Sequence, residues 1–445
     1  MIESYLSDES GVEGQATGIA FPKSIEELQE TVKKAAEKKE KITIQSGRTG
    51  FCGGAVPQDS FIINMSKMNH AGEIIFDAEK RTGEITVGAG FTLANLNTII
   101  DTYNRKAPIK LQFYPNPSET EATLGGIAAT AACGSAIGPG IKGAVKSIVL
   151  VDARGGIQSI KNNSSSSLCS SPYSSLSTSF SSSPLRGEAR WGADVIIGSE
   201  GTLGIIAELT LLLTAAPPCT YGLFAFFDTY QNALQFYTEY KHYLSTNTAI
   251  LLNVADWFDL SCNDRVAGFP QFPENTALAL WLEIAGEEDV LLDSLETAMT
   301  LLDKTIPTLA DKTLAATEET DLKRLKTFRH QLTEDANQKQ MKTIDYVITK
   351  DFLVKNEDIL QQLRASAPPR ELFFMGHLET NILNIRYNQD SLPLSFKDNP
   401  VSHEHGIGQA KRSLFLQNNP EEAAMWTALK KVVDSDGLLN PGVLI

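Results

Sequence analysis

A glycine-rich segment, residues 45–54, most constrains how this chain can fold. It lies between two short β-prone runs, 41–44 and 61–64, and glycine fills four of the eight positions from 47 to 54. Glycine lets the backbone adopt positive φ and turn several N–H groups toward one point. Such a group of amides binds an anion, most often a phosphate. A tight connection between two strands is the alternative that this loop alone leaves open.

Two further glycine-rich stretches, 122–134 and 196–206, follow in the first half of the chain. In the first, Gly125 and Gly126 precede small residues, which suits a helix N-terminus lying against a flat, negatively charged ligand. The second runs into an expected strand at 207–213. The first loop, 45–54, has the spacing neither of a Walker loop nor of a dinucleotide-binding fingerprint, and nothing indicates NAD. Together they favour a cofactor-binding domain over three unrelated turns.

Length, charge and cysteine content set the class of protein. A chain of 445 residues is too long for one core, so we expect two or three domains. The net charge of −15 argues against binding to nucleic acid, although a local basic site can still bind a small acid. The five cysteines lack CxxC spacing, which indicates a reduced compartment and argues against an iron–sulfur centre. With neither a signal peptide nor a membrane-length apolar run visible, we expect a cytoplasmic protein, or one peripheral to the inner membrane.

Local patterns predict an α+β fold in both halves of the chain. Ser24 and Glu27 form a capping box that starts a helix. Pro217-Pro218 marks a domain boundary. The other expected elements are strands at 84–90, 147–152, 221–227 and 276–284, and helices at 92–103, 230–243, 290–302 and 420–433. We therefore predict domains at 1–215 and 216–400 and a C-terminal segment at 401–445.

Residues 164–183 have an unusual composition, because thirteen of the twenty are serine. Such a segment cannot bury a core, so we expect a surface loop or a disordered segment. A docking or modified segment is the functional alternative.

Three motifs carry a resemblance to a known family: Q-S-G-R-T-G-F-C-G-G, then A-T-L-G-G-I-A-A-T-A-A-C-G, then G-S-E-G-T-L-G-I. In this order they resemble the FAD-binding (PCMH-type) domain of the vanillyl-alcohol oxidase superfamily. Within it, the chain is similar to the D-lactate, glycolate and D-2-hydroxyglutarate dehydrogenase branch. The resemblance implies an FAD-binding domain, a ferredoxin-like α+β substrate (cap) domain, and a C-terminal helical segment that returns to the flavin domain. The first loop lacks the histidine to which some members attach flavin, so FAD should be bound non-covalently.

The resemblance also assigns the residues that hold FAD, including the asparagine of the C-terminal L-N-P-G. Without the resemblance, a helix end made by Gly and Pro would explain the L-N-P-G motif equally well. The implied cofactor-binding residues are Gly47, Arg48, Thr49, Gly50, Gly53, Gly54, Pro115, Leu124, Gly125, Gly126, Thr130, Gly134, Glu200, Gly201, Gly204, Ile205 and Asn440.

Histidine and carboxylate residues near the end of the chain suggest a base and a metal site. Imidazole is the natural base near neutral pH, and a carboxylate beside it can hold a divalent metal; a polar surface turn is the plain alternative. The family has E-H-G-I-G here, which implies Glu404 as metal ligand and His405 as catalytic base. It also has two metal-binding histidines, usually for zinc or manganese. His377 matches the first, but Asn384 replaces the second, so we expect a metal that is bound weakly or not at all unless His403 substitutes.

Arg329, Thr333 and Lys350 match the family residues that bind the substrate carboxylate. A guanidinium grips a carboxylate with two parallel hydrogen bonds, although solvated surface charge is the common reading of such residues. The resemblance thus implies an FAD-dependent dehydrogenase of small D-2-hydroxy acids.

The electron acceptor is expected to be a quinone, an electron-transfer flavoprotein or another carrier, and a homodimer is one option for the assembly. Two other functions stay open. One is a metal-free FAD-binding subunit of a larger oxidase complex with little activity alone. The other is a flavoenzyme of the same fold with different chemistry, such as alkylglycerone-phosphate synthase.

Overall fold

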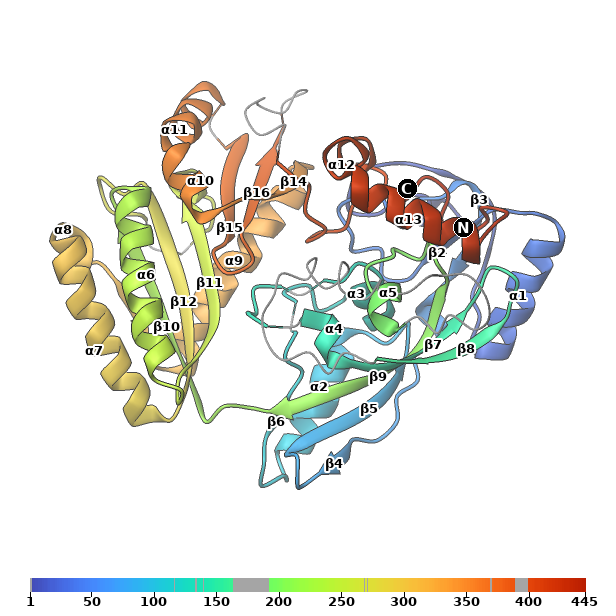
Figure 1. Cartoon of the computed structure of the whole chain (residues 1–445), viewed down its shortest axis with the longest axis horizontal. Coiled ribbons are helices and arrows are strands. Elements are labelled where there is room, and N and C mark those ends of the chain that lie inside the picture. Colours follow the sequence, from blue (N-terminus) through green and yellow to red (C-terminus); the bar gives the residue numbers. More distant parts are fainter. Residues whose placement is uncertain are drawn as a thin grey trace. The chain divides into compact units, whose positions relative to one another are not determined.

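The computed structural model forms two units, each combining helices with sheets, which confirms the predicted α+β class (Figure 1). Unit 1 comprises Met1–Ala216 and Val401–Ile445, and unit 2 comprises Pro217–Pro400. The serine-rich segment 164–183 lies outside the described residues. The residues described are 2–115, 117–132, 134–138, 140–162, 192–267, 269, 271–368, 370–388 and 399–445.

Unit 1 begins with a small parallel sheet in the order β1-β3-β2. Its strands are β1 (Gln15–Ala20), β2 (Ile42–Gln45) and β3 (Gln58–Asn64), and helix α1 (Ile25–Glu37) connects β1 to β2. The hydroxyl of Ser24 accepts a hydrogen bond from the Glu27 N–H at 3.3 Å, so α1 starts at the predicted cap. The glycine-rich loop of residues 46–54 begins where β2 ends.

A second, antiparallel sheet forms the rest of the N-terminal part of unit 1, in the order β4-β5-β9-β7-β8, with β6 also paired to β9. Its strands are β4 (Ile75–Asp77), β5 (Thr82–Gly88), β6 (Leu111–Gln112), β7 (Val145–Val151), β8 (Ile157–Lys161) and β9 (Ile205–Ala215). The accompanying helices are α2 (Leu93–Asn104), α3 (Leu124–Ala129), α4 (Gly140–Ala144) and α5 (Ala193–Ile196). The second glycine-rich stretch thus opens α3, as expected, and the third leads into β9.

The C-terminal segment belongs to unit 1 and contributes helices α12 (Arg412–Asn418) and α13 (Pro420–Val433). After α13 the chain pairs with β2: Ile42 donates to the Leu438 carbonyl and receives a bond from the Asn440 N–H, both at 2.7 Å. The ammonium of Lys430 contacts the Asp434 carboxylate at 2.7 Å and the Thr202 carbonyl at 3.1 Å. This confirms the predicted return of the C-terminal segment to the N-terminal domain.

Unit 2 is built on an antiparallel sheet of seven described strands in the order β13-β10-β12-β11-β15-β16-β14. The strands are β10 (Cys219–Phe227), β11 (Leu251–Asp259), β12 (Leu278–Gly286), β13 (Leu314–Ala316), β14 (Lys342–Val347), β15 (Leu372–His377) and β16 (Ile382–Tyr387). The helices are α6 (Tyr230–Thr246), α7 (Glu288–Thr305), α8 (Pro307–Ala310), α9 (Glu319–Gln338), α10 (Lys350–Lys355) and α11 (Glu357–Ser366). The elements β10-α6-β11-β12-α7-β13 follow one another as β-α-β-β-α-β, which is the ferredoxin-like arrangement that was expected.

The sheet of unit 2 has helices on both faces: α6 and α7 cover one face, and α9 packs on the other (Figure 1). On the α9 face, the ring of Phe224 contacts the rings of Phe258 and Phe328 with centroids 5.8 and 5.5 Å apart. This apolar cluster anchors α9 to the sheet, because such aromatic pairs add to the free energy of area burial. Helix α9 carries Arg329, so its attachment fixes that side chain relative to the sheet.

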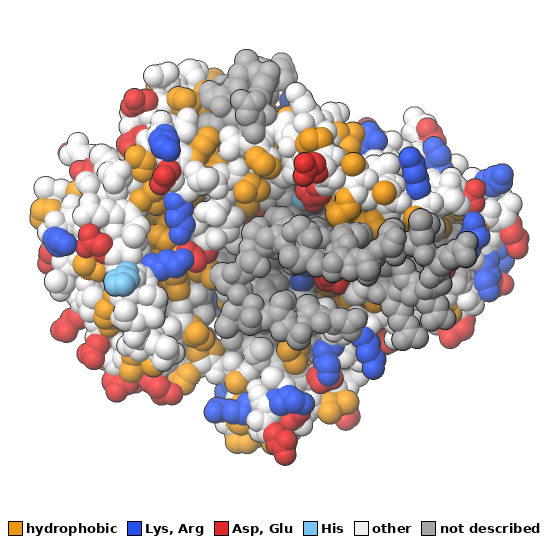
Figure 2. Space-filling model, viewed as in Figure 1, with side chains coloured by type: hydrophobic (Ala, Val, Ile, Leu, Met, Phe, Trp, Pro, Cys, Tyr) orange, Lys and Arg blue, Asp and Glu red, His pale blue; other side chains and the backbone are white. Residues whose placement is uncertain are grey.

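Acidic and basic side chains are interspersed over the described surface shown in Figure 2. In the described part of the chain, no helix has the length and hydrophobicity needed to cross a membrane.

Candidate functional site

Unit 1 contains a cavity of about 780 Å³, including solvent at its mouth, between the three glycine-rich stretches and the C-terminal segment. Its lining is mostly glycine, alanine and aliphatic side chains, with Gln45, Glu200, His405 and Asn440 among the polar groups. The lining therefore suits a ligand with apolar faces and a few polar contacts.

The first glycine-rich loop contributes Ser46, Gly50, Cys52 and Gly54 to the lining of this cavity. Within the described residues, the amides of 47–50 donate no hydrogen bond to any other group of the chain. Arg48 takes the left-handed conformation, with φ of 60°, and stacks its guanidinium over the Tyr5 ring at 4.8 Å. The side chain of Arg48 thus packs on the N-terminal segment, while the loop backbone keeps its donors for an anion such as a pyrophosphate.

Two glycines of the cavity allow contacts that any larger residue would prevent. A Cβ on Gly125 would lie 2.6 Å from the Cβ of Ala89, so α3 packs closely on the end of β5 only with glycine there. Gly201 has φ of 72°, and a Cβ on it would lie 2.7 Å from Nδ2 of Asn440. The G-S-E-G-T-L-G motif therefore needs this glycine both for its turn and for contact with the C-terminal segment.

Glu200 and Asn440 join the C-terminal segment to the cavity wall. The buried Glu200 carboxylate accepts the N–H groups of Ile407 and Gly408 at 2.7 and 2.8 Å. Asn440 donates through Nδ2 to the Glu200 carbonyl at 2.6 Å, and its Oδ1 accepts the Ile44 N–H at 2.7 Å. Both contacts hold the segment that carries His405, whose ring lies edge-on to Phe51 with centroids 5.9 Å apart. The cavity wall is thus assembled from both ends of the chain.

Most of the predicted cofactor-binding residues are placed at this cavity. Those that line it are Gly50, Gly54, Gly125, Gly126, Thr130, Glu200, Gly201, Gly204, Ile205 and Asn440. Those outside its lining are Gly47, Arg48, Thr49, Gly53, Pro115, Leu124 and Gly134. Glu200 lines the cavity, but its carboxylate is bound by the C-terminal segment, so its role there is to hold the wall.

The structure adds lining residues that the motifs did not single out: Asp8, Ile44, Gln45, Ser46, Cys52, Ala55, Met65, Ala89, Ala129, Ile206 and Gly406. Several lie within or beside the glycine-rich motifs, so reading the whole motif would have found them. Asp8 carries no such signal; burial raises the pKa of its carboxyl, while hydrogen bonds from Ser10 and the Ala55 N–H lower it less.

In unit 2, Arg329 and His377 come together on the α9 face of the sheet. The Arg329 Nε donates to Oδ2 of Asp256 at 2.9 Å, and Oδ1 of the same carboxylate contacts Nδ1 of His377. The Nη2 of Arg329 lies 3.4 Å from Nε2 of His377. We call these three residues the Asp256 cluster; each of them is at most 8% exposed.

Lys350 and Thr333, predicted to act with Arg329, have different surroundings. The ammonium of Lys350 contacts Oε1 of Glu379 at 3.2 Å and lies over the Tyr237 ring. Burial raises the pKa of the Glu379 carboxyl, but bonds from Lys241 and Tyr237 and the charge of Lys350 outweigh it, so the net pKa is lowered. Thr333 is half-buried on α9, four residues after Arg329. Lys350 is thus already paired with a carboxylate of the chain itself.

The predicted metal ligands are distributed over both units. Asn384 is fully buried on β16 and donates through Nδ2 to Asp345 at 2.7 Å. Glu404 lies in unit 1, two residues before Gly406 in the lining. His403, the suggested substitute, contacts the Glu422 carboxylate at 2.9 Å and packs its ring on Phe415. Among the described residues, no group of three or more His, Cys, Asp or Glu is arranged to hold a metal ion.

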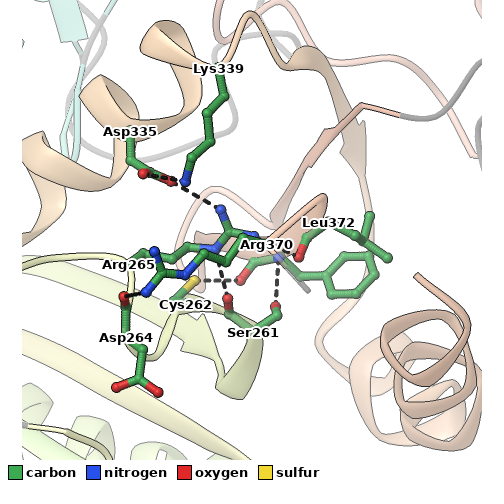
Figure 3. Close-up of polar contacts among 9 residues, drawn as sticks. Ser261, Cys262, Asp264, Arg265, Asp335, Lys339, Arg370 and Leu372 are labelled. Carbon is green, nitrogen blue, oxygen red and sulfur yellow. Dashed lines mark hydrogen bonds and ion pairs between the residues drawn. The ribbon is translucent and has the colours of Figure 1, made fainter. Parts of the chain in front are cut away.

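A polar network around Arg265 connects α9 to β15 (Figure 3). The guanidinium of Arg265 donates to Asp335 of α9 at 3.1 Å and to the Leu372 carbonyl of β15 at 3.0 Å. Its Nε also donates to the Ser261 carbonyl at 2.8 Å. Arg265 thus joins α9, which carries Arg329, to β15, which carries His377.

Comparison with protein families identifies both parts of unit 1. Residues 16–161 match the FAD binding domain, and residues 400–444 match the C-terminal domain of FAD linked oxidases. These matches confirm the predicted resemblance and FAD as the cofactor.

The same fold and related sequences occur over nearly the whole chain. A mitochondrial D-2-hydroxyglutarate dehydrogenase of Danio rerio is 25% identical over 97% of this chain and 78% of its own length. A D-lactate dehydrogenase of Archaeoglobus fulgidus is 25% identical over 96% of this chain and 91% of its own. A solved alkyldihydroxyacetonephosphate synthase superposes with a TM-score of 0.62 at 16% identity, covering 95% of this chain and 76% of that one.

Replacing Asn440 by glycine tests the link between the C-terminal segment and the cavity. Glycine keeps the left-handed backbone of Asn440, whose φ is 42°, but removes both side-chain hydrogen bonds. We expect a loss of about 1–3 kcal/mol in the free energy of unfolding and less FAD retained after gel filtration. The control is Asn275→Gly, an exposed position with φ of 65°. Equal FAD retention in both variants would show that Asn440 does not support the cavity.

The Glu422–His403 pair predicts a pH-dependent part of the stability. Burial raises the pKa of Glu422, but hydrogen bonds from His403, Trp426 and Asn419 outweigh it and hold the pKa below its ordinary value of 4.5. The stabilisation is therefore present above pH 4.5 and is lost as pH falls through the lower, folded-state pKa.

Melting temperatures of the wild type and Glu422→Gln measured against pH test this expectation. The difference should be largest near neutral pH and shrink below pH 4.5, the ordinary pKa of the group. Glu421→Gln, at the exposed neighbouring position, is the control and should show little difference at any pH. A difference between wild type and Glu422→Gln that stays constant into strong acid would contradict the assignment.

Proposed function

We propose that this chain, an FAD-dependent oxidoreductase, oxidises a small D-2-hydroxy acid to the corresponding 2-oxo acid. The observation that carries the proposal is the unit 1 cavity, which is framed by both FAD-linked oxidase domains and lined by His405. Relatives named D-lactate and D-2-hydroxyglutarate dehydrogenases cover nearly the whole chain, which supports a 2-hydroxy acid as the substrate class.

The residues of the cavity fit FAD. The amides of 47–50, which donate no hydrogen bond to the rest of the described chain, suit the pyrophosphate, and the small residues Ala89, Gly125 and Gly126 of the lining leave room for a ring system. FAD supplies hydride acceptance at N5 when it is bound. Non-covalent attachment remains a prediction, and acid precipitation should release the flavin from the protein.

The chain's own residues have distinct proposed roles. Arg329, with Thr333 and Lys350 assisting, would bind the substrate carboxylate, because a guanidinium offers paired donors in a fixed plane. The imidazole of His405 would take the proton of the substrate hydroxyl, since it is the titratable ring that lines the cavity. Electrons would leave through a quinone, an electron-transfer flavoprotein or another carrier.

Anaerobic mixing of the FAD-loaded protein with a panel of D- and L-2-hydroxy acids tests the proposal. We expect bleaching of the oxidised flavin by at least one D-acid and not by its L-enantiomer. The panel should include glycolate, lactate and 2-hydroxyglutarate, which differ in the group on C2. If no acid bleaches a fully loaded sample, the chain is instead an inactive FAD-binding subunit or an enzyme of the same fold with other chemistry.

Substitution of Arg329 tests the carboxylate role. Arg329→Lys keeps the charge but loses the planar fork, and Arg329→Ala loses both, so the KM for the acid should rise in that order. Removing one partner of a desolvated charge pair costs about 2–5 kcal/mol, which sets the scale for the alanine variant. Lys323→Ala, at an exposed position of the same helix, is the control and should leave KM unchanged. Wild-type KM in both Arg329 variants would place this residue outside the substrate site.

A further inference from the structure

We infer that Asp256 is a positioning residue that fixes Arg329 and His377 as one unit, and that this unit works without a divalent metal. The inference deepens the proposed function and rests on it for the identity of the substrate. Its second half departs from the metal site that the sequence resemblance implies, and it follows from the hydrogen bonds that His377 makes.

The placement of Asp256 is fixed by the sheet and not by flexible loops. It lies on β11 directly opposite His377 of β15, so the two side chains project from the same face. Its two carboxylate oxygens contact different partners. Oδ2 accepts a hydrogen bond from the Arg329 Nε at 2.9 Å, and Oδ1 contacts the His377 Nδ1. One buried carboxylate therefore sets both the position of the guanidinium and the rotation of the imidazole.

This arrangement uses both nitrogens of His377. A contact between Nδ1 and a carboxylate places a proton on Nδ1, which leaves Nε2 as the acceptor of the neutral ring. Nε2 lies 3.4 Å from Nη2 of Arg329, and a guanidinium can only donate. The lone pair of His377 is therefore directed at Arg329. A metal ion at Nε2 would therefore have to displace the guanidinium of Arg329.

The surroundings of His377 also oppose a metal. A divalent ion at Nε2 would lie close to the fixed positive charge of Arg329 in a buried place, where such repulsion is weakly screened. Asn384 supplies an amide in place of a second imidazole, and an amide oxygen is not among the nitrogen, thiolate and carboxylate ligands that zinc sites normally use. The donor set on the α9 face therefore does not fit zinc or manganese, and the positive charge beside His377 comes from a guanidinium.

Metal titration of the FAD-loaded wild type tests the metal-free part directly. Zn²⁺ and Mn²⁺ are added separately in a calorimeter, and bound metal is counted by elemental analysis after gel filtration. We expect well under one metal per flavin, and no change in flavin reduction after dialysis against a chelator. One metal per flavin that is lost in His377→Ala would overturn the inference. This measurement decides the question even if no 2-hydroxy acid proves to be a substrate.

Kinetics of Asp256→Asn test the positioning part. An amide cannot accept from both Arg329 and His377 as the carboxylate does, so both groups lose their fixed orientation. A misplacement of about 1 Å can cost about 100-fold in rate, so we expect a fall of that order in kcat/KM with the acid. Asp256→Glu, which keeps the charge, should recover part of the loss.

Asp259→Asn is the matched control for a general loss of stability. Asp259 is a buried carboxylate on the same strand, where it accepts from Tyr230 at 2.7 Å and from Arg364 at 2.8 Å. The Asp259→Asn substitution should lower the melting temperature without raising the KM for the acid. If Asp256→Asn and Asp259→Asn change kcat/KM equally, Asp256 has only a structural role and the inference fails. If Asp256→Asn does not fold, the KM of Asp256→Glu decides, since wild-type kinetics there would contradict positioning.

Discussion

The carboxylate of Glu200 makes the contact on which the cavity of unit 1 depends. It accepts two backbone N–H groups, the nearer of which lies 207 residues away along the chain. Because those donors belong to the E-H-G-I-G segment, the same contact places His405 in the cavity lining. Asn440 closes the arrangement from the other side by bonding β2 and the Glu200 carbonyl. The two matched domains of the chain are therefore one folding unit that is separated only in sequence.

Unit 2 contains several charged side chains on a buried face of its sheet. An unpaired buried charge is costly, so each such group needs a partner with good geometry. Asp256 meets this need for Arg329 and His377, and Lys326 contacts the buried Glu283 at 3.2 Å. The aromatic cluster around Phe224 then fixes α9 against the same face. Apolar packing thus positions the charged groups, and the charged groups neutralise one another.

Sequence reasoning succeeded where the signal is local. Glycines in close succession predicted the stretches that line the cavity, and the Ser24–Glu27 pattern predicted the start of α1. Asp256 gave no such signal, because its partners lie 73 and 121 residues away and meet it only through helix packing and strand register. The pairing of Lys350 with Glu379 was missed for the same reason. Long-range pairing of charges depends on topology, which local spacing does not encode.

The central claim is that this protein binds FAD in the unit 1 cavity and uses it to oxidise a 2-hydroxy acid at C2. The most direct test is the rate of anaerobic flavin reduction by the best D-acid, compared with the same acid carrying deuterium at C2. The account predicts that deuterium slows flavin reduction, because the C2–H bond breaks as the flavin is reduced. Reduction at the same rate with both acids, under conditions where chemistry limits the rate, would contradict it, as would a loaded flavin that no 2-hydroxy acid reduces.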